Sequence, residues 1–139
     1  ISATLEYLET LGVPVIGYRC DMMPAFWSQS AELRVDYRLD SAAEIADLCI
    51  QKWRAGLNGG VLIANPIPQV NQIDPAKIET AITDALALAD EKSISGKALT
   101  PFLLEQIRHI TGGVSLHANK ALVRNNAFLA ADIAAEMTS

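Results

Sequence analysis

The residues best suited to contact a ligand are two asparagines in a long amphipathic segment, residues 115–134. Asn119 and Asn126 are seven positions apart, so a helix places both on one side together with Leu129. That side is expected to face a core, where an unpaired carboxamide is costly. We expect Asn126 to be buried and bonded to a neighbouring element, and Asn125 to be exposed. Asn119 lies near the start of the helix, closer to a cleft, where its coplanar donor and acceptor could match the edge of a nucleobase.

Three further residues stand where ligands often bind. Asn65 follows an apolar strand-like run, and ligands of open α/β sheets gather at the carboxyl ends of strands. The alternative is that Asn65 only caps its own turn. Lys97 precedes a helix that we expect to begin at Thr100, and a lysine beside a helix start attracts anions. A solvated lysine and a plain Thr-Pro cap are the alternative, because the phosphate-loop signature is absent.

No catalytic group and no metal ligand is expected in this chain. The two cysteines, Cys20 and Cys49, and the two histidines, His109 and His117, have no metal-ligand spacing. The pattern favours two buried thiols in a reducing compartment rather than a disulfide. No nucleophile motif is present, and the carboxylates fall mostly on helix surfaces.

Charge and hydropathy exclude two classes of partner. The net charge is −5 and the basic residues form no run, so a nucleic-acid surface is not expected. No apolar run reaches membrane-spanning length and no signal peptide is visible. We therefore expect an intracellular, cytoplasmic protein.

The elements that must position these residues follow an α/β pattern. Apolar runs predict strands at residues 13–18 and 59–66, with a short extended piece near residues 35–39. Capping signals and periodicity predict helices over residues 4–10, 41–53, 74–92, 100–111 and 115–134. Strand, helix and strand in this order predict a parallel unit. Two or three strands are too few for a complete parallel sheet, and the first residues already have the pattern of a helix interior. For both reasons we expect the chain to be a fragment.

Several blocks resemble one family. Four of these blocks occur in the following order along the chain: GLNGGVLIANPIP, SGKALTPFLL, the S-L-x-x-N motif and LVRNNAFLAADIA. Together they make the chain similar to the C-terminal half of the pseudouridine-5′-phosphate glycosidases, the indigoidine synthase A-like family. The resemblance implies that residues 1–139 are the C-terminal half of a single domain. It also implies an α/β/α sandwich with a mainly parallel central sheet and a homotrimer.

The family resemblance also implies a reaction. Family enzymes reversibly cleave the C–C glycosidic bond of pseudouridine 5′-phosphate to uracil and ribose 5-phosphate, through a lysine Schiff base with a glutamate as acid and base. They hold Mn²⁺ through an aspartate. These three residues belong to the N-terminal half and have no counterpart here, since Lys97 does not match the catalytic lysine's motif. Asn119 matches the asparagine that contacts uracil, and Asn65 and Thr100 fall in family blocks that shape the pocket.

The implied partners are the N-terminal half of the same enzyme, further copies in a trimer, and a small-molecule substrate. One alternative is a non-catalytic truncated homologue that serves as a structural or interaction module through its apolar sheet edge. Another is a small nucleoside- or phosphate-binding protein without catalysis.

Overall fold

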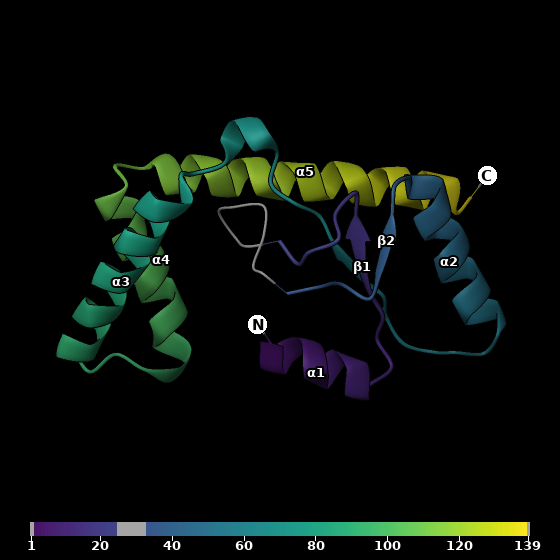
Figure 1. The fold of residues 1–139 in the computed structure, drawn as a ribbon, viewed down its shortest axis with the longest axis horizontal. Coiled ribbons are helices and arrows are strands. Elements are labelled where there is room, and N and C mark those ends of the chain that lie inside the picture. The colour runs from purple at the N-terminus through teal and green to yellow at the C-terminus, as the bar shows by residue number, and fades with distance from the viewer. Residues whose placement is uncertain (1, 25–32, 139) are drawn as a thin grey trace.

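A computed structural model describes residues 2–24 and 33–138 of the chain (Figure 1). Its sheet has three parallel strands in the order β2-β1-β3: β1 is Val15–Tyr18, β2 is Tyr37–Leu39 and β3 is Leu62–Ala64. The expected α/β class with a parallel sheet is confirmed. Of the region between β1 and β2, where we expected a loop or short helix, residues 25–32 lie outside the described part.

The two predicted strands differ in burial. Three of the four residues of β1, the central strand, are buried. The prediction that β3 is equally buried is wrong, because Leu62 is exposed and only Ala64 is fully buried. The reason is its place in the sheet: within the described chain β3 pairs only with β1, so its outer side has no strand beside it.

The described residues also form five helices and two short 3₁₀ turns. The helices are α1 (Ser2–Thr10), α2 (Ala42–Arg54), α3 (Pro75–Glu91), α4 (Leu99–Ile110) and α5 (Val114–Glu136), and the turns are η1 (Gln69–Asn71) and η2 (Gly96–Ala98). The capping box of Ser41 with Glu44 and the cap at Asp74 start α2 and α3 as the sequence predicts.

The starts of α4 and α5 differ from the prediction. Thr100 does not cap α4, because Ala98 is already helical and η2 runs directly into the helix at Leu99. Ser115 does not cap α5 either: Gly113 holds the cap position with a φ of 87°, and Ser115 is buried inside the first turn. A positive φ is the conformation that glycine adopts without steric cost, so the Gly-Gly pair sets where α5 begins.

Helix α5 joins two separate cores. It runs along the molecule, with the α3–α4 hairpin at its amino end and α2 near its carboxyl end (Figure 1). The first core combines α3 and α4 with Ala118 of α5, and its buried members are Ile67, Ile73, Ile78, Ala81, Ala85, Ile107 and Ala118. The second combines the sheet and α2 with the far end of α5, and its buried members are Ile16, Ile45, Ala46, Cys49, Leu129 and Ile133.

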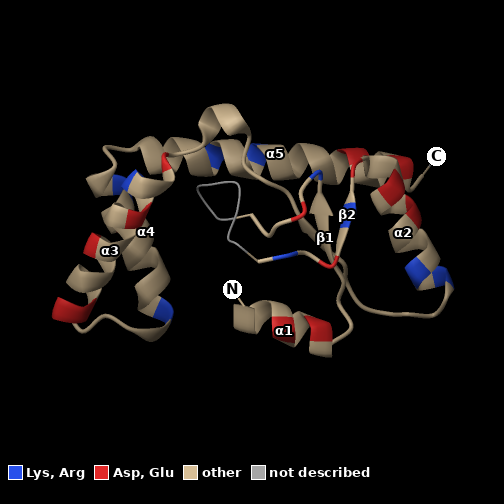
Figure 2. Ribbon diagram, viewed as in Figure 1, with Lys and Arg blue, Asp and Glu red and all other residues tan. Residues whose placement is uncertain are grey.

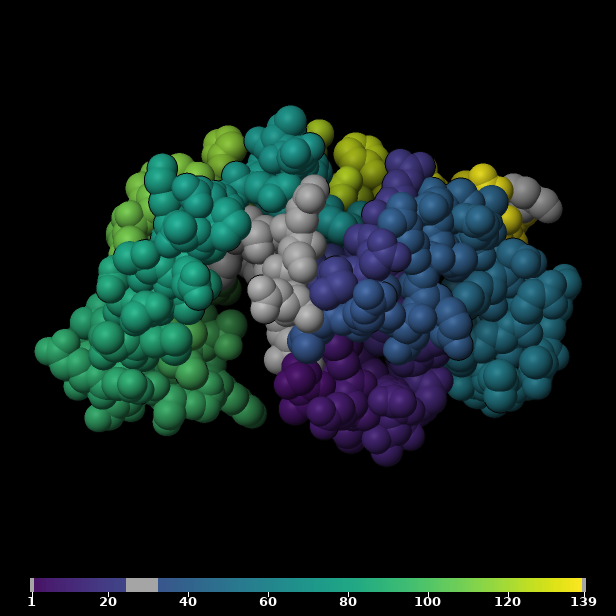
Figure 3. All heavy atoms as spheres, viewed as in Figure 1, coloured from purple at the N-terminus to yellow at the C-terminus, as the bar shows by residue number. Residues whose placement is uncertain are grey.

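The α3–α4 hairpin projects from the remainder of the described chain in the space-filling view (Figure 3). No helix among the described residues has the length and apolar character needed to span a bilayer.

Candidate functional site

The carboxyl ends of all three strands lie on the same side of the sheet, because the strands are parallel. We call this side the carboxyl edge, or sheet edge. At this edge β1 continues into Cys20 and Asp21, β2 into Asp40, and β3 into Asn65. The close approach of these turns depends on Gly17 in the middle of β1. A Cβ at this position would overlap the carbonyl oxygen of Cys20, which leaves room for glycine alone.

A pair of asparagines fastens α5 to the exit of β3. Asn65 donates its amide hydrogen to the side-chain oxygen of Asn126, with 3.1 Å between Nδ2 and Oδ1. Asn125 donates to the carbonyl oxygen of Pro66 at 3.1 Å. Asn65 therefore bonds across to α5 rather than capping its own turn. We call these four residues the asparagine clasp.

Two predictions about the clasp are wrong. Asn126 was expected to be buried and is exposed, although it does bond to a neighbouring element; Asn125 was expected to be exposed and is half-buried. The cause is that the clasp lies between the two cores. At this point α5 contacts the end of β3, and no layer of apolar side chains covers it. The sequence signal for Asn125 was the Asn-Asn pair itself, because asparagine disfavours a helix interior unless its side chain finds another partner.

Asn119 lies on the same side of α5, two turns before Asn126. Its side chain is half-buried at the wall of a hollow of about 250 Å³ between α4 and α5. The other lining residues are Pro101, Leu104, Glu105, Arg108, Ser115 and Leu116. Within residues 2–24 and 33–138, no hydrogen bond involves the Asn119 carboxamide, so both its donor and its acceptor are available to a ligand.

The remaining candidates are not gathered around Asn119. Thr100 and Lys97 are exposed and do not line its hollow, although the neighbouring Pro101 does. The loop that carries Lys97 lies at the end of the α3–α4 hairpin away from α5 (Figure 1). The structure therefore places Asn119 on α5 and Asn65 beside the same helix, where it bonds to Asn126, and Lys97 lies in the loop at the other end of the hairpin.

The hollow beside Asn119 has an ion pair at its rim. Arg108 donates to Glu105 with 2.6 Å between Nη2 and Oε1, and His109 lies 2.8 Å from the same oxygen. The Arg108 guanidinium, aided by His109, lowers the pKa of Glu105 to about 2. Glu105 is therefore a carboxylate at neutral pH and is not available as a proton donor.

A second charged cluster lies at the sheet edge. Arg38 forms ion pairs of 2.8 Å with both Asp21 and Asp40, and these bonds raise the pKa of Arg38. The Cys20 thiol donates to the carbonyl oxygen of Ala64 at 3.7 Å, and burial raises its pKa, so it stays protonated.

This cluster does not fit the Mn²⁺ that the family resemblance implies. Manganese prefers several oxygen ligands, but the carboxylates of Asp21 and Asp40 already bind a guanidinium. Among the described residues, no group of three His, Cys, Asp or Glu side chains could hold a metal ion.

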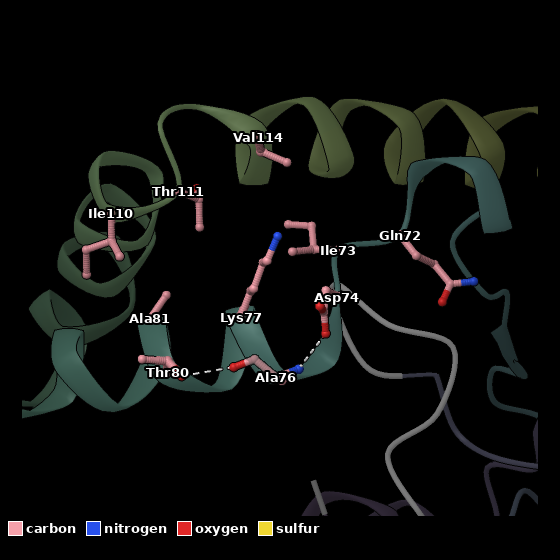
Figure 4. A pocket seen from close by; sticks show the side chains of 10 residues that line it. All are labelled: Gln72, Ile73, Asp74, Ala76, Lys77, Thr80, Ala81, Ile110, Thr111 and Val114. Atoms are coloured by element: carbon pink, nitrogen blue, oxygen red, sulfur yellow. Dashed lines mark hydrogen bonds between the residues drawn. The ribbon is translucent and has the colours of Figure 1, made fainter.

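A further hollow, of about 750 Å³, lies between α3 and the junction of α4 with α5 (Figure 4). Lys77 extends from α3 across it toward Thr111 and Val114, and Ile73 and Ile110 form apolar walls (Figure 4). None of the residues that the sequence singled out lines this hollow. Its walls can cover an apolar group but offer no arrangement of nucleophile and base.

Fold and site together define an α/β protein with polar side chains at the carboxyl edge of a parallel sheet and, on the long helix α5, a carboxamide without a hydrogen-bond partner among the described residues. Residues 1–136 match the family described as indigoidine synthase A like protein, and the chain belongs to this family.

Curated relatives are identical to this chain at about half of the aligned positions. The chain is 55% identical to a pseudouridine-5′-phosphate glycosidase of Geobacillus kaustophilus, over 99% of this chain and 46% of that protein. It is 48% identical to the glycosidase of the same name in Escherichia coli, over 98% of this chain and 44% of that protein. The chain therefore spans less than half the length of these relatives.

Two solved structures have the same fold. One is the prealnumycin C-glycosynthase AlnA in complex with ribulose 5-phosphate, with a TM-score of 0.87 and 35% identity over 98% of this chain and 45% of that chain. The other is an indigoidine synthase A-like protein of Thermotoga maritima, with a TM-score of 0.85 and 32% identity over 99% of this chain and 45% of that chain.

Proposed function

We propose that residues 1–139 form the C-terminal half of a pseudouridine-5′-phosphate glycosidase domain and supply the wall of its uracil pocket. The names of the curated relatives and the coverage of less than half their length support this assignment. The complete enzyme would cleave the C–C glycosidic bond of pseudouridine 5′-phosphate reversibly to uracil and ribose 5-phosphate. The N-terminal half would supply the Schiff-base lysine, the glutamate and the Mn²⁺ ligand, and the complete enzyme would assemble as a trimer.

One observation carries the proposal: the Asn119 carboxamide is half-buried beside a hollow and has no hydrogen-bond partner within the described chain. A half-buried amide that has no partner in the described chain is free to pair with a ligand or with another polypeptide segment. Uracil presents alternating carbonyl and N–H groups, and a single carboxamide can donate to one and accept from the other. Asn119 would thereby orient the base and hold it while the glycosidic bond breaks.

The other residues of this chain position Asn119. The asparagine clasp fixes α5 against the exit of β3 through two hydrogen bonds of 3.1 Å. Asn65, as part of this clasp, shapes the pocket without contacting the substrate. Thr100 and Lys97 are exposed and do not line the hollow beside Asn119, so we assign them no contact with the substrate.

The test is reconstitution. The chain is produced alone and together with the N-terminal half of a close relative, and uracil release from pseudouridine 5′-phosphate is followed by chromatography. We expect activity only from the combination. Turnover by the chain alone, or no turnover by a combination that forms a stable complex, would contradict the proposal.

Asn119→Ala in the active combination tests the role of this residue. We expect kcat/KM to fall about 10- to 150-fold, the loss of one or two hydrogen bonds to a bound base. The matched control is Asn58→Ala, an exposed asparagine in the turn after α2, which should leave kcat/KM unchanged. A fall of the melting temperature without a specific loss of activity would instead assign Asn119 to packing.

Exposed apolar side chains favour a second function, a non-catalytic interaction module. Tyr7, Tyr37 and Val123 are each at least 60% exposed, which suits a surface covered by another polypeptide. This alternative predicts a stable complex with the N-terminal half that has no glycosidase activity, so the reconstitution experiment separates the two.

A further inference from the structure

A groove with only basic and neutral side chains lies on the side of α5 opposite Asn119. Asn119 and Phe128 are nine residues apart, about two and a half helical turns, so they point in opposite directions. The groove measures about 470 Å³, within the range of small-ligand pockets. Its polar and aromatic lining comes from Asn71, His117, Lys120, Arg124, Asn125 and Phe128.

The cations of this groove have no counter-charge in the described chain. Lys120 and Arg124 are exposed, and neither takes part in any of the ion pairs among residues 2–24 and 33–138. The turn that forms the opposite wall, residues 65–73, contains no charged residue. In Figure 2, blue bands mark the middle of α5, and red bands occur only toward its carboxyl end. Lys120 and Arg124 are four residues apart on the helix, so their like charges repel each other weakly, and an anion between them would relieve this repulsion.

The groove also extends toward the start of α5. A neighbouring hollow of about 530 Å³ shares Asn71 and His117 with it and reaches Gly113, the cap residue of the helix. Gly113 itself offers no side chain to cap the helix, but the first-turn N–H groups are already paired: Ser115 donates to Oγ1 of Thr111 at 3.2 Å, and Leu116 and His117 donate to the carbonyl oxygen of Gly113. The helix start therefore adds only the field of the helix dipole to that of the two cations. Both features favour an anionic ligand.

The far end of the groove offers a flat apolar surface. Phe128 is 63% exposed and lies one turn beyond Arg124, about 6 Å along the helix axis. An aromatic ring at this position can stack on a flat heterocycle. The spacing suits a molecule in which a sugar separates a phosphate from a base.

We propose that this groove binds a nucleoside monophosphate, with its phosphate between Lys120 and Arg124 and its base on Phe128. His117 and Asn71 lie at the end toward Gly113, where they can donate to the remaining phosphate oxygens. Asn125 is engaged with Pro66 and forms the floor. The proposal does not depend on glycosidase activity.

The test is calorimetric titration of the 139-residue chain with uridine 5′-monophosphate, with uridine and inorganic phosphate as partial ligands. Arg124→Gln and Lys120→Gln should each raise Kd about tenfold, the loss of one charge-assisted contact. Phe128→Ala should weaken binding of the nucleotide and leave that of inorganic phosphate unchanged. The matched control is Arg54→Gln, which removes the same charge from an exposed position on α2 and should change Kd less than about twofold.

Three results would overturn the proposal. The first is no saturable binding of the nucleotide at millimolar concentration and physiological salt. The second is equal weakening by Arg54→Gln, which would mean non-specific attraction. The third is that Lys120→Gln with Arg124→Gln abolishes assembly with the N-terminal half, which would make the groove a protein interface. Asn119→Ala should leave this binding intact, so failure of the groove and failure of the uracil pocket are distinguishable.

Discussion

Replacement of Gly17 by alanine gives the sharpest test of how the sheet edge is built. Gly17 is the third residue of the central strand, and its backbone is buried between β2 and β3. A Cβ built there overlaps the carbonyl oxygen of Cys20 and lies 2.9 Å from Cγ2 of Val35. The first obstacle is backbone in the turn that leaves β1, so it cannot move aside as the end of a flexible side chain would.

The magnitude follows from this geometry. Inserting a methyl group into a well-packed interior costs about 1–3 kcal/mol, and the upper end applies here because the turn itself must shift. A loss of about 3 kcal/mol is a large part of the stability of a domain of this size, about 5–15 kcal/mol. It corresponds to a fall of about 10 °C in the melting temperature.

The assay is urea and thermal unfolding of the 139-residue chain followed by circular dichroism, and two other glycines provide controls. Gly60 has no atom within 4 Å of an added Cβ, so Gly60→Ala should change the free energy of unfolding by less than about 0.5 kcal/mol. Gly12 has equally open space but a φ of +65°, so Gly12→Ala should cost about 1 kcal/mol from backbone strain alone. If Gly17→Ala unfolds within about 0.5 kcal/mol of the wild type, the proposed packing of the turn against β1 is refuted.

Three further predictions concern single side chains. Asn125→Ala should lower the free energy of unfolding by about 1–2 kcal/mol in urea titrations, because it leaves the carbonyl oxygen after β3 without its partner. Lys52→Met should lower it by about 1–2 kcal/mol and increase hydrogen exchange in the turn at residues 57–59, whose three carbonyl oxygens lie 2.8–3.2 Å from the Lys52 ammonium. The pKa of Glu105 is lowered from 4.5 to about 2, so its pairing with Arg108 stabilises the fold above pH 4.5 and is lost as the pH falls toward 2. Glu105→Gln should therefore flatten the dependence of the melting temperature on pH in that window, and an unchanged slope would contradict the pairing.

Local sequence signals predicted the order of elements and most helix boundaries. The apolar runs around Val15 and Leu62 lie where β1 and β3 form, because β-branched and apolar residues without charges suit a parallel sheet. The capping residues Ser41 and Asp74 start α2 and α3 as predicted, since their hydrogen bonds involve only neighbours in the sequence.

Burial and partner choice were less predictable, because they depend on what lies across the element. Periodicity placed Asn126 on the apolar side of α5, but that side passes from one core to the other at this point and faces the end of β3. The apolar run at residues 59–66 predicted a buried strand, but Leu62 is exposed because β3 is an outer strand of the described sheet. Thr100 does not cap α4, because η2 continues directly into this helix, which begins at Leu99, before the position that the Thr-Pro signal indicates.

The position of the clasp explains why a polar pair interrupts the apolar side of α5. Ala118 belongs to the core with α3 and α4, while Leu129 and Ile133 belong to the core with the sheet and α2. Without a fixed point between them, the helix could shift relative to the sheet edge at little cost, because hydrophobic contacts are not directional. Hydrogen bonds are directional, so the bonds from Asn65 and Asn125 set the register of α5 against β3. On the same side of α5 they hold Asn119, which has no hydrogen-bond partner among the described residues, at a defined position relative to the edge where ligands of parallel sheets bind.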